Sequence, residues 1–470
     1  MEILTEKPLC FEIEKGILNK HDRLDAHYLH PVYLELEEKL AKSPFELKTL
    51  ADISESISCG STPKDYDPFA NKGVLFLKTV NVQDGWLDLK EKYYISEKCH
   101  SKRKISEVRK NDLLMTIIGA NEEIVGRVAL VRENIIANIN QNIVRIRIKK
   151  TQVLPKYVEA FLSTKIGRNL ILRISRTATR VNMNIKEVKA IRIPIPSKKI
   201  QEKIIQIMEG ARAKRRQNLK EVARLKKEFD NFFLKELGLA YPEEKEENVF
   251  ITKLDERLDP YYYHPRFIRI MNSLKAGKFE LKKLKEIIEF SNEQIDPKRE
   301  PNRVFKYIQI QNVDEENHKI SSYTHVLGKE APGRAKMLVR EGDILLPVLG
   351  GSLKSVAIVS KEFDREVATN GFAVLRVKDE NLRYFVFYYL TTKFAQLQIE
   401  RNLTGAIMPS VSKSELRKIL IPMPDLETQK RIAKKVQEVE NKITKLLIEA
   451  EEVINIAKEK VEKIILGEDV

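Results

Sequence analysis

Cysteine is scarce in this sequence, and long apolar runs are missing. The 470 residues contain three cysteines, Cys10, Cys59 and Cys99, which are scattered and odd in number. This pattern argues against a disulfide framework or a zinc cluster and favours a reducing compartment. No apolar run approaches the roughly 20 residues that a membrane-spanning helix needs, and the N-terminus lacks the charged-then-apolar pattern of a secretion signal. We therefore expect a soluble, cytoplasmic protein that does not contact a membrane.

Motifs for catalysis are also missing. The sequence has no Gly-x4-Gly-Lys-Ser/Thr phosphate loop. Asp259-Pro-Tyr-Tyr262 looks like an amino-methyltransferase loop, but it lacks the second proline, and no glycine-rich turn for S-adenosylmethionine lies upstream. Pro424-Asp425 with Glu440 and Lys442 imitates a nuclease metal motif, but the last two residues fall on a predicted helix. We therefore expect no catalytic residue, no cofactor and no metal.

Acidic residues are too few to balance the basic ones. The chain has 84 Lys and Arg against 68 Asp and Glu, which gives a net charge of +16 and a pI near 9.4. Such a surplus favours polyanionic partners, above all nucleic acid. The alternative interpretation is a lysine-rich, solvated surface without a specific partner.

One large unit occurs twice in the chain. The lead-in Arg23-Leu-Asp-Ala-His-Tyr-Leu-His-Pro31 returns 234 residues later (257 − 23) as Arg257-Leu-Asp-Pro-Tyr-Tyr-Tyr-His-Pro265. Three further strings return in the same order: Phe76–Val82 as Tyr307–Val313, Val108–Gly119 as Val339–Gly350, and Ile193–Pro196 as Ile421–Pro424. The offset falls to 228 (429 − 201) where Gln201 is answered by Gln429. Ordered matches at a nearly constant offset indicate a two-copy array.

Each copy ends in a long helical pattern. Apolar or small residues recur at steps of three and four in both copies, although Arg215 and Asn218 occupy the seam of the first copy between Ala211 and Val222 and weaken it. The residues are Ile204, Met208, Ala211, Val222, Leu225, Phe229 and Phe232, and then Ile432, Val436, Val439, Ile443, Leu446, Ala450, Val453, Ala457, Val461 and Ile464. Ser197 and Asp425 are the expected N-caps, and Gly238 and Gly467 the expected ends. Each helix should be about 55–60 Å long at 1.5 Å per residue. Because neither can bury its seam alone, we expect an antiparallel coiled-coil pair, with hinges at Pro194 and Pro196.

The remainder of each copy predicts a mixed α/β domain. Runs of β-branched and apolar residues predict strands in the first copy at Gly73–Val82, Asp112–Gly119, Arg127–Val131 and Asn142–Ile148. A helix is expected at Tyr157–Ile174 and its twin at Leu382–Arg401. The fold class is therefore α+β: two similar α/β domains separated by the antiparallel helix pair, with pseudo-two-fold symmetry. The expected boundaries are 1–199, 200–238 for the central helix, 239–250 for a linker, 251–424, and 425–470 for the C-terminal helix.

The lead-in string predicts a local structural element in both copies. Arg23 with Asp25, and Arg257 with Asp259, should each form an ion pair at a turn where the domain joins its helix. The histidines of this string, His27, His30 and His264, have no cysteine or clustered carboxylate beside them. We therefore expect them to pack or to lie at the surface rather than to bind metal.

Polar loops between the strands provide the candidate DNA-binding residues. Ser175–Asn182 combines arginines with short hydroxyl side chains, a mixture that suits phosphate contacts. Amides at strand ends are the side chains that pair with adenine. The predicted DNA-binding residues are Ser61, Thr62, Lys64, Asn81, Asn121, Gln141, Arg176, Thr177, Thr179, Arg180, Gln309, Gln311, Asn312, Ser352, Lys354 and Thr404.

The duplicated lead-in and the Ile-Pro-x-Pro strings before the long helices resemble the specificity (S) subunits of Type I restriction–modification systems. Gly60-Ser-Thr-Pro63 is similar to that family's Gly-x-Thr-Pro loop, which is degraded to Gln294-Ile-Asp-Pro297 in the second copy, and Thr404-Gly405 is similar to its Thr-Gly loop. The resemblance covers nearly the whole chain.

This resemblance implies two target-recognition domains, each reading one half of a bipartite site in double-stranded DNA. It also implies helices that bind methyltransferase (M) subunits, expected to be two, and through them restriction (R) subunits. The helix residues expected to serve these partners are Gln201, Ile204, Phe229, Gln429, Ile432 and Val453. The resemblance implies no catalytic centre in the chain. The alternatives are a stand-alone methyltransferase or nuclease with an unrecognised site, and a scaffold that binds only proteins.

Overall fold

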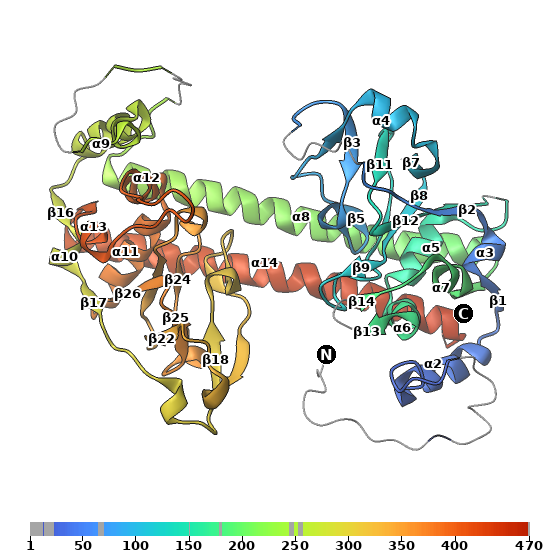
Figure 1. Ribbon diagram of the computed structural model, residues 1–470. Coiled ribbons are helices and arrows are strands. Elements are labelled where there is room, and N and C mark those ends of the chain that lie inside the picture. The colour runs from blue at the N-terminus through green and yellow to red at the C-terminus, as the bar shows by residue number, and fades with distance from the viewer. Residues whose placement is uncertain are drawn as a thin grey trace. The chain divides into compact units, whose positions relative to one another are not determined.

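The computed structural model describes residues 13, 23–63, 70–149, 151–177, 181–243, 249–251 and 257–468 (Figure 1). The chain forms two compact units, one of residues 1–220 with 446–470 and the other of residues 221–445. Each unit combines helices with mixed sheets, which confirms the predicted α+β class. Two helices of 40 and 41 residues run through both units.

The first unit is built on two four-stranded sheets. One has the order β10 (Val128–Leu130), β8 (Asp112–Thr116), β12 (Ile143–Ile148), β2 (Ser54–Cys59), and the other has β6 (Tyr94–Ile95), β3 (Val74–Leu77), β11 (Ala137–Ile139), β7 (Glu107–Val108). Smaller sheets join β13 (Arg176–Thr177), β14 (Val181–Asn182) and β9 (Ile118–Gly119), β1 (Glu46–Thr49) and β15 (Arg192–Ile195), and β4 (Val82–Gln83) and β5 (Trp86–Leu87). The predicted strands of this unit are thus confirmed, with shorter limits.

The second unit repeats this strand order. Its sheets have the orders β24 (Ala357–Ile358), β23 (Ile344–Pro347), β26 (Phe372–Arg376), β17 (Glu289–Ser291), and β21 (Thr324–Leu327), β18 (Val304–Ile308), β25 (Val367–Thr369), β22 (Ala335–Leu338). The pairs β16 (Leu281–Lys283) with β27 (Leu420–Pro422), and β19 (Val313–Asp314) with β20 (Lys319–Ile320), complete it. In both units one strand pair is parallel, β3 with β11 and β18 with β25. The sequence repeat is therefore a repeat of topology.

Short helices cover the sheets. They are α2 (Pro31–Ala41), α3 (Leu50–Ile53), α4 (Glu97–Ser101), α5 (Pro155–Leu162), α6 (Lys165–Ile174) and α7 (Ile185–Ala190), and then α9 (Pro265–Lys275), α10 (Leu284–Ile287), α11 (Glu380–Thr391), α12 (Lys393–Arg401) and α13 (Lys413–Leu416). The single helices predicted at 157–174 and 382–401 are wrong, because each is interrupted. Thr164 and Thr392 begin new helices by accepting hydrogen bonds from the amides of Gly167 and Ala395.

The long helices are α8 (Lys198–Leu237) and α14 (Leu426–Leu466). Their predicted ends are confirmed: α8 starts after Ser197, the Asp425 carboxylate caps α14 by accepting from Thr428 N at 2.8 Å, and Gly238 and Gly467 follow with φ of 64° and 78°. In the first unit Arg215 pairs with Glu451 at 3.3 Å.

In the second unit Arg431 Nε donates to Glu236 at 2.9 Å. Within each unit the partner's number in α14 falls as the number in α8 rises, from Glu451 to Leu446 for Arg215 and Asn218, and from Lys442 to Arg431 for Glu221 and Glu236, so the helices are antiparallel.

The expected hinge before each long helix is instead a paired strand. Ile193–Ile195 belongs to β15, which pairs with β1 over four residues. The Gln201 side chain, one turn into α8, donates to Pro196 O at 2.9 Å and accepts from Leu154 N at 2.9 Å. Gln429 makes the same bond to Pro424 O at 2.8 Å. The two glutamines therefore fasten each long helix to the strand that precedes it.

Candidate nucleic-acid interface

Four polar loops of the first unit meet at one end of its sheet. Ser61 N donates to Ile139 O at 3.2 Å, and Ile117 N donates to Asn142 O at 2.8 Å, which joins the loop after β2 to those beside β12 and β8. Strand β9 then pairs with β14, which pairs with β13. Gly60 permits this approach, because a Cβ there would lie 2.0 Å from Ile139 O. Loops distant in sequence thus form one edge.

Most of the predicted side chains of this edge are exposed. Ser61 and Thr62 face solvent, and the Thr62 hydroxyl donates to Gln141 Oε1. Asn121 is exposed and accepts from Ile124 N at 3.2 Å. Arg176 is 57% exposed and donates to Glu187 at 2.9 Å. Each of these groups retains hydrogen-bonding capacity toward a ligand.

The side chains of four predicted DNA-binding residues cannot be placed at this edge. Lys64, Thr179 and Arg180 lie outside the described residues, and Thr177 is described only as part of β13. A role for them in DNA binding stays a prediction.

Two of the predicted amides are turned inward. Asn81 is buried; its Oδ1 accepts from Lys78 N at 2.9 Å, and its Nδ2 donates to Asp88 O and Glu91 O. Asn312, its repeat partner, accepts from Gln309 N at 2.8 Å and donates to Ser322. Both asparagines stabilise a 3-10 turn after a central strand. Both side chains therefore form their hydrogen bonds within the chain, whereas Gln311, inside the second turn, is exposed.

The second unit forms the matching edge from three loops. Val348 N donates to Gly371 O and Val411 N donates to Val348 O, both at 2.9 Å. Thr404 and Ser410 form a bridge, and the exposed Thr404 hydroxyl donates to Ser410 O at 3.3 Å. Ser352 and Lys354 follow the first of these loops, and Ser352 is half-buried and Lys354 exposed. Gln309, which directly follows β18, is half-buried. Thr404, Ser352 and Lys354 therefore lie on or beside the loops at this sheet end, and their role in DNA binding stays a prediction.

Two apolar residues at this second edge were missed by the sequence interpretation. Ile407 and Met408 lie between the bridge residues Thr404 and Ser410 and are 95% and 59% exposed. The signal that reveals them is an apolar pair in a loop opened by Gly405, whose φ is 102°.

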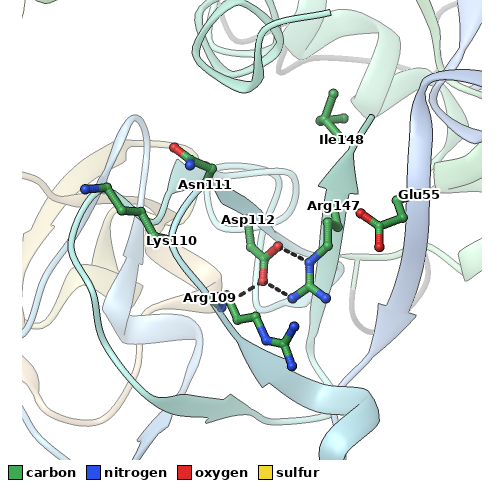
Figure 2. A pocket seen from close by; sticks show the side chains of 7 residues that line it. All are labelled: Glu55, Arg109, Lys110, Asn111, Asp112, Arg147 and Ile148. Atoms are coloured by element: carbon green, nitrogen blue, oxygen red, sulfur yellow. Dashed lines mark hydrogen bonds and ion pairs between the residues drawn. The ribbon is translucent and has the colours of Figure 1, made fainter. Parts of the chain in front are cut away.

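An ion pair lies at the start of β8, the end opposite the polar edge, and the second unit repeats it at the start of β23. Arg147 donates to Asp112 through Nε and Nη2 at 2.7 and 2.8 Å, and Arg109 N donates to the same carboxylate at 2.8 Å (Figure 2). The hydrogen bond to Asp112 outweighs burial and raises the pKa of Arg147. These side chains line a pocket of about 390 Å³ together with Glu55, Lys110, Asn111 and Ile148.

The second unit contains the same pair. Arg376 donates twice to Asp343 at 2.9 Å, and Arg340 N donates to Asp343 at 3.0 Å. The left-handed residue of the turn is Asn111 in one copy and Gly342 in the other, with φ of 73° and 82°. A buried pair retained in both copies fixes the start of the strand that ends at the polar edge.

The predicted partner-binding residues of the long helices are mostly inside the protein. Gln201, Ile204, Phe229, Gln429 and Ile432 are buried, and Val453 is half-buried. They hold the helices to each other and to the sheets. Leu219, Ile448 and Ile456 are the large apolar side chains that α8 and α14 leave exposed in the first unit. Partner binding by the helices stays a prediction, and these three off-seam residues were missed because the search followed the seam.

Metal and membrane sites are not supported by the described part of the chain. No group of three or more His, Cys, Asp or Glu side chains there is arranged to hold a metal ion. His30 and His264 instead cap α2 and α9 by accepting backbone N–H bonds at 3.3 Å. None of the helices in these same ranges has the length and apolar character needed to cross a membrane.

A duplicated α+β domain with a polar loop edge in each copy, on a chain of net charge +16, is the arrangement expected of a two-domain nucleic-acid-binding protein. Residues 42–222 and 276–454 match the family model of the Type I restriction modification DNA specificity domain, so the chain belongs to that family. The family resemblance inferred from the sequence is thereby confirmed.

Two curated relatives and a solved structure are similar. The chain is 31% identical over 137 residues to the Type I restriction enzyme EcoBI specificity subunit of Escherichia coli, covering 29% of this chain and 28% of that protein. It is 23% identical over 442 residues to the putative MjaX specificity subunit of Methanocaldococcus jannaschii, covering 90% and 92%. The Type-I restriction-modification S subunit from M. genitalium is 14% identical, with a TM-score of 0.42 over 90% of this chain and 96% of that one.

Proposed function

We propose that this chain is the DNA-specificity subunit of a Type I restriction–modification complex and reads a bipartite duplex site, one half with each unit. The observation that carries the proposal is the duplicated polar edge within a chain of the specificity family. Two recognition domains of one topology suit two separated half-sites on duplex DNA.

The expected partners follow from the same proposal. The long helices bind methyltransferase subunits, with two as the expected number, and restriction subunits join through them. Catalysis then belongs to those partners, and this chain contributes the sequence preference. The interpretation as a stand-alone methyltransferase or nuclease is not favoured by the family match.

Exchange of one recognition segment tests the proposal. Residues 45–190 are replaced by the corresponding segment of a relative that recognises another sequence, and the chimera is expressed with its M subunit. Mapping of methylated sites in the host should show one changed half-site and one unchanged half-site.

The matched control is the exchange of residues 279–418, the equivalent segment at the repeat offsets, which should change the other half only. If either exchange alters both halves, or neither, the two units do not read the target independently.

A further inference from the structure

Two guanidinium groups lie over a tyrosine ring in each unit, the half-buried Tyr28 and the buried Tyr262. In the first, Arg173 and Arg23 lie 4.5 and 5.1 Å from the Tyr28 ring centroid. In the second, Arg401 and Arg257 lie 3.7 and 4.8 Å from that of Tyr262. The positions correspond at the repeat offsets of 234 (262 − 28) and 228 (401 − 173). The lead-in string thus builds one Arg–Tyr–Arg cluster per copy.

The cluster of the first unit is neutralised and largely hydrogen-bonded by its own chain, with Arg173 Nη2 left as a buried donor that has no partner among the described residues. Arg23 donates to Ile174 O at 2.8 Å and to Ser175 O at 3.1 Å, and it also pairs with Asp25 at 2.6 Å, as the sequence predicted. Arg173 Nε donates to Tyr28 O at 3.1 Å, and its Nη1 donates to Glu37 at 3.0 Å. Carbonyls and carboxylates therefore take all three side-chain nitrogens of Arg23 and two of the three of Arg173, whose charge Glu37 neutralises.

The cluster of the second unit is open. The predicted Arg257–Asp259 ion pair is replaced by a looser one, in which Arg257 lies 3.7 Å from Glu415, and Asp259 caps Tyr261 N instead. Arg401 donates through Nε to Tyr262 O at 3.0 Å. Within the described ranges, neither Nη group of Arg401 has a hydrogen-bond partner.

Substitution between the copies explains this difference. Glu37, which neutralises Arg173, corresponds to Met271 (37 + 234) in the second copy, and Ala190 corresponds to Lys418 (190 + 228). Met271, Lys418, Arg257 and Arg401 line one pocket of about 440 Å³, to which Glu415 contributes the acidic side chain. The lining therefore carries three cations against one carboxylate.

We propose that this pocket in the second unit binds a phosphate group. Paired guanidinium groups match the oxygens of phosphate, and an excess of two positive charges suits a dianion better than a monovalent carboxylate. The neighbouring amide Gln398 is already committed to Tyr389 and Leu420 O, and Lys418 Nζ donates to Glu415 at 2.8 Å, so the guanidinium groups of Arg401 and Arg257 are the donors available to an anion. The phosphate belongs either to the DNA backbone or to a free phosphate compound. The assignment does not rest on the function proposed above.

Isothermal titration of the full chain with inorganic phosphate tests the site. We expect one bound phosphate per chain. Met271→Glu installs the acid of the first copy beside Arg401 and should weaken binding by roughly tenfold or more, because a charge-assisted bond is then satisfied internally. Met271→Gln, of similar length but neutral, should bind within a few-fold of the unchanged chain. Unfolding temperatures of all three proteins establish that they are folded.

A second variant keeps the proposal testable if Met271→Glu does not fold. The Lys418 side chain is 63% exposed, so Lys418→Ala leaves the Arg–Tyr–Arg cluster intact and should weaken phosphate binding several-fold. The proposal is overturned if the unchanged chain shows no saturable phosphate binding, if Met271→Glu binds as tightly as Met271→Gln, or if acetate competes as well as phosphate does.

Duplex DNA distinguishes the two sources of the phosphate. If the pocket takes a backbone phosphate, Met271→Glu should reduce the slope of log K against log salt by about 0.9, the value for one phosphate contact. If it takes a free phosphate compound, Met271→Glu and the unchanged chain should bind DNA with the same affinity and slope.

Discussion

A single carboxylate holds the first unit's sheet to its long helix. Glu159 is fully buried and accepts two hydrogen bonds from Arg132, at 2.9 and 2.6 Å, and one from Arg212 of α8 at 2.7 Å. Glu159→Gln would leave both arginines under-neutralised in a buried place. We expect the free energy of unfolding to fall by about 3–5 kcal/mol, the usual cost of removing one partner from a buried pair. Urea unfolding measures this change.

Glu209 supplies the matched control. It contacts the same arginines, Arg132 at 3.4 Å and Arg212 at 3.9 Å, but its side chain is partly exposed. Burial alone would raise the pKa of Glu209; the charges of Arg132, Lys156 and Arg212 outweigh it and lower that pKa. Glu209→Gln should cost less than about 1 kcal/mol. Equal losses for the two variants would contradict the assignment of Glu159 as the central group.

Arg176 is the exposed cation that the first polar edge presents. Replacing Arg176 and Arg180 together by alanine should lower affinity for every DNA sequence and reduce the slope of log K against log salt by roughly two. Glu187, which pairs with Arg176, provides the control, because Glu187→Gln frees the arginine and should not weaken binding. A changed sequence preference with an unchanged slope would mean that these arginines contact bases.

The residue types in the sequence predicted where polar side chains lie along the strands better than they predicted what those side chains bind. The amides at strand ends do lie at strand ends, but whether Asn81 turns inward depends on the carbonyls of Asp88 and Glu91, which no short motif specifies. Likewise, the partner of Tyr28 is Arg173, which lies far away in the sequence. The sequence repeat is the signal that could have pointed to such partners, because Arg173 and Arg401 correspond at the offset of 228 that holds in this part of the repeat.

At the scale of elements, the contact between the long helices should depend on pH. Hydrogen bonds from Arg224, and then from Lys442 of α14, lower the pKa of Glu221 to about 2. Because this pKa is depressed in the folded state, its contribution is complete above the usual value of 4.5 and is lost as the pH falls toward 2. Glu221→Gln should remove part of the decline in unfolding temperature across that window.

The effect should be small, because Glu221 is at the surface, and it should shrink in high salt. Lys442→Met, which removes the partner on the other helix, should reproduce part of it. An identical pH profile for Glu221→Gln and the unchanged chain would show that the pair contributes nothing.

A buried amide interrupts the apolar seam of the helix pair. Asn218 of α8 is almost fully buried, and its Nδ2 lies 3.4 Å from Leu446 O and 3.5 Å from Glu449. Polar residues at such positions fix helix register at a cost in stability. We expect Asn218→Leu to raise the free energy of unfolding by about 1 kcal/mol, from added apolar burial. A large loss in thermal unfolding would instead show that the amide stabilises the pair.

Periodicity predicted the long elements well and the short ones less well. The forty-residue helices appear with their caps because a seam of many turns outweighs local preferences. The break at Thr164 could not be read from periodicity, because the apolar spacing continues through it. It is set by packing: a Cβ at Gly167 would lie 2.2 Å from Phe161 O, so the two helices meet closely at this point.

For the whole molecule, we predict that the long helices set the spacing between half-sites. Insertion of one heptad near Leu219 and another near Leu446 keeps the seam in register and lengthens each helix by about 10 Å. That length corresponds to about three base pairs, which also turn the duplex by roughly 100°. Binding to the original spacer should be lost. Affinities measured over a series of spacer lengths test this expectation.

Paired strands lie where hinges were expected. The double-insertion protein should therefore bind a site with a longer spacer only if the β1–β15 or the β16–β27 pairing breaks and lets the recognition domain rotate. A heptad inserted in α8 alone serves as the control. It displaces the apolar residues of α8 by one heptad relative to those of α14, so the two seams no longer match along their length and folding should be impaired. A folded double-insertion protein that still prefers the original spacer would show that the helices are not the ruler.

The last turns of α14 belong to the core of the first unit, and this has a consequence for synthesis on the ribosome. Val461, Ile464 and Ile465 pack in one cluster with residues as early as Leu36, and Ser43 donates to Ile465 O at 2.7 Å. The N-terminal domain therefore emerges early but cannot complete its core until residue 465 has left the exit tunnel. Nascent chains stalled after residue 445 should remain protease-sensitive in the N-terminal half, which makes the start of this protein the last part to mature.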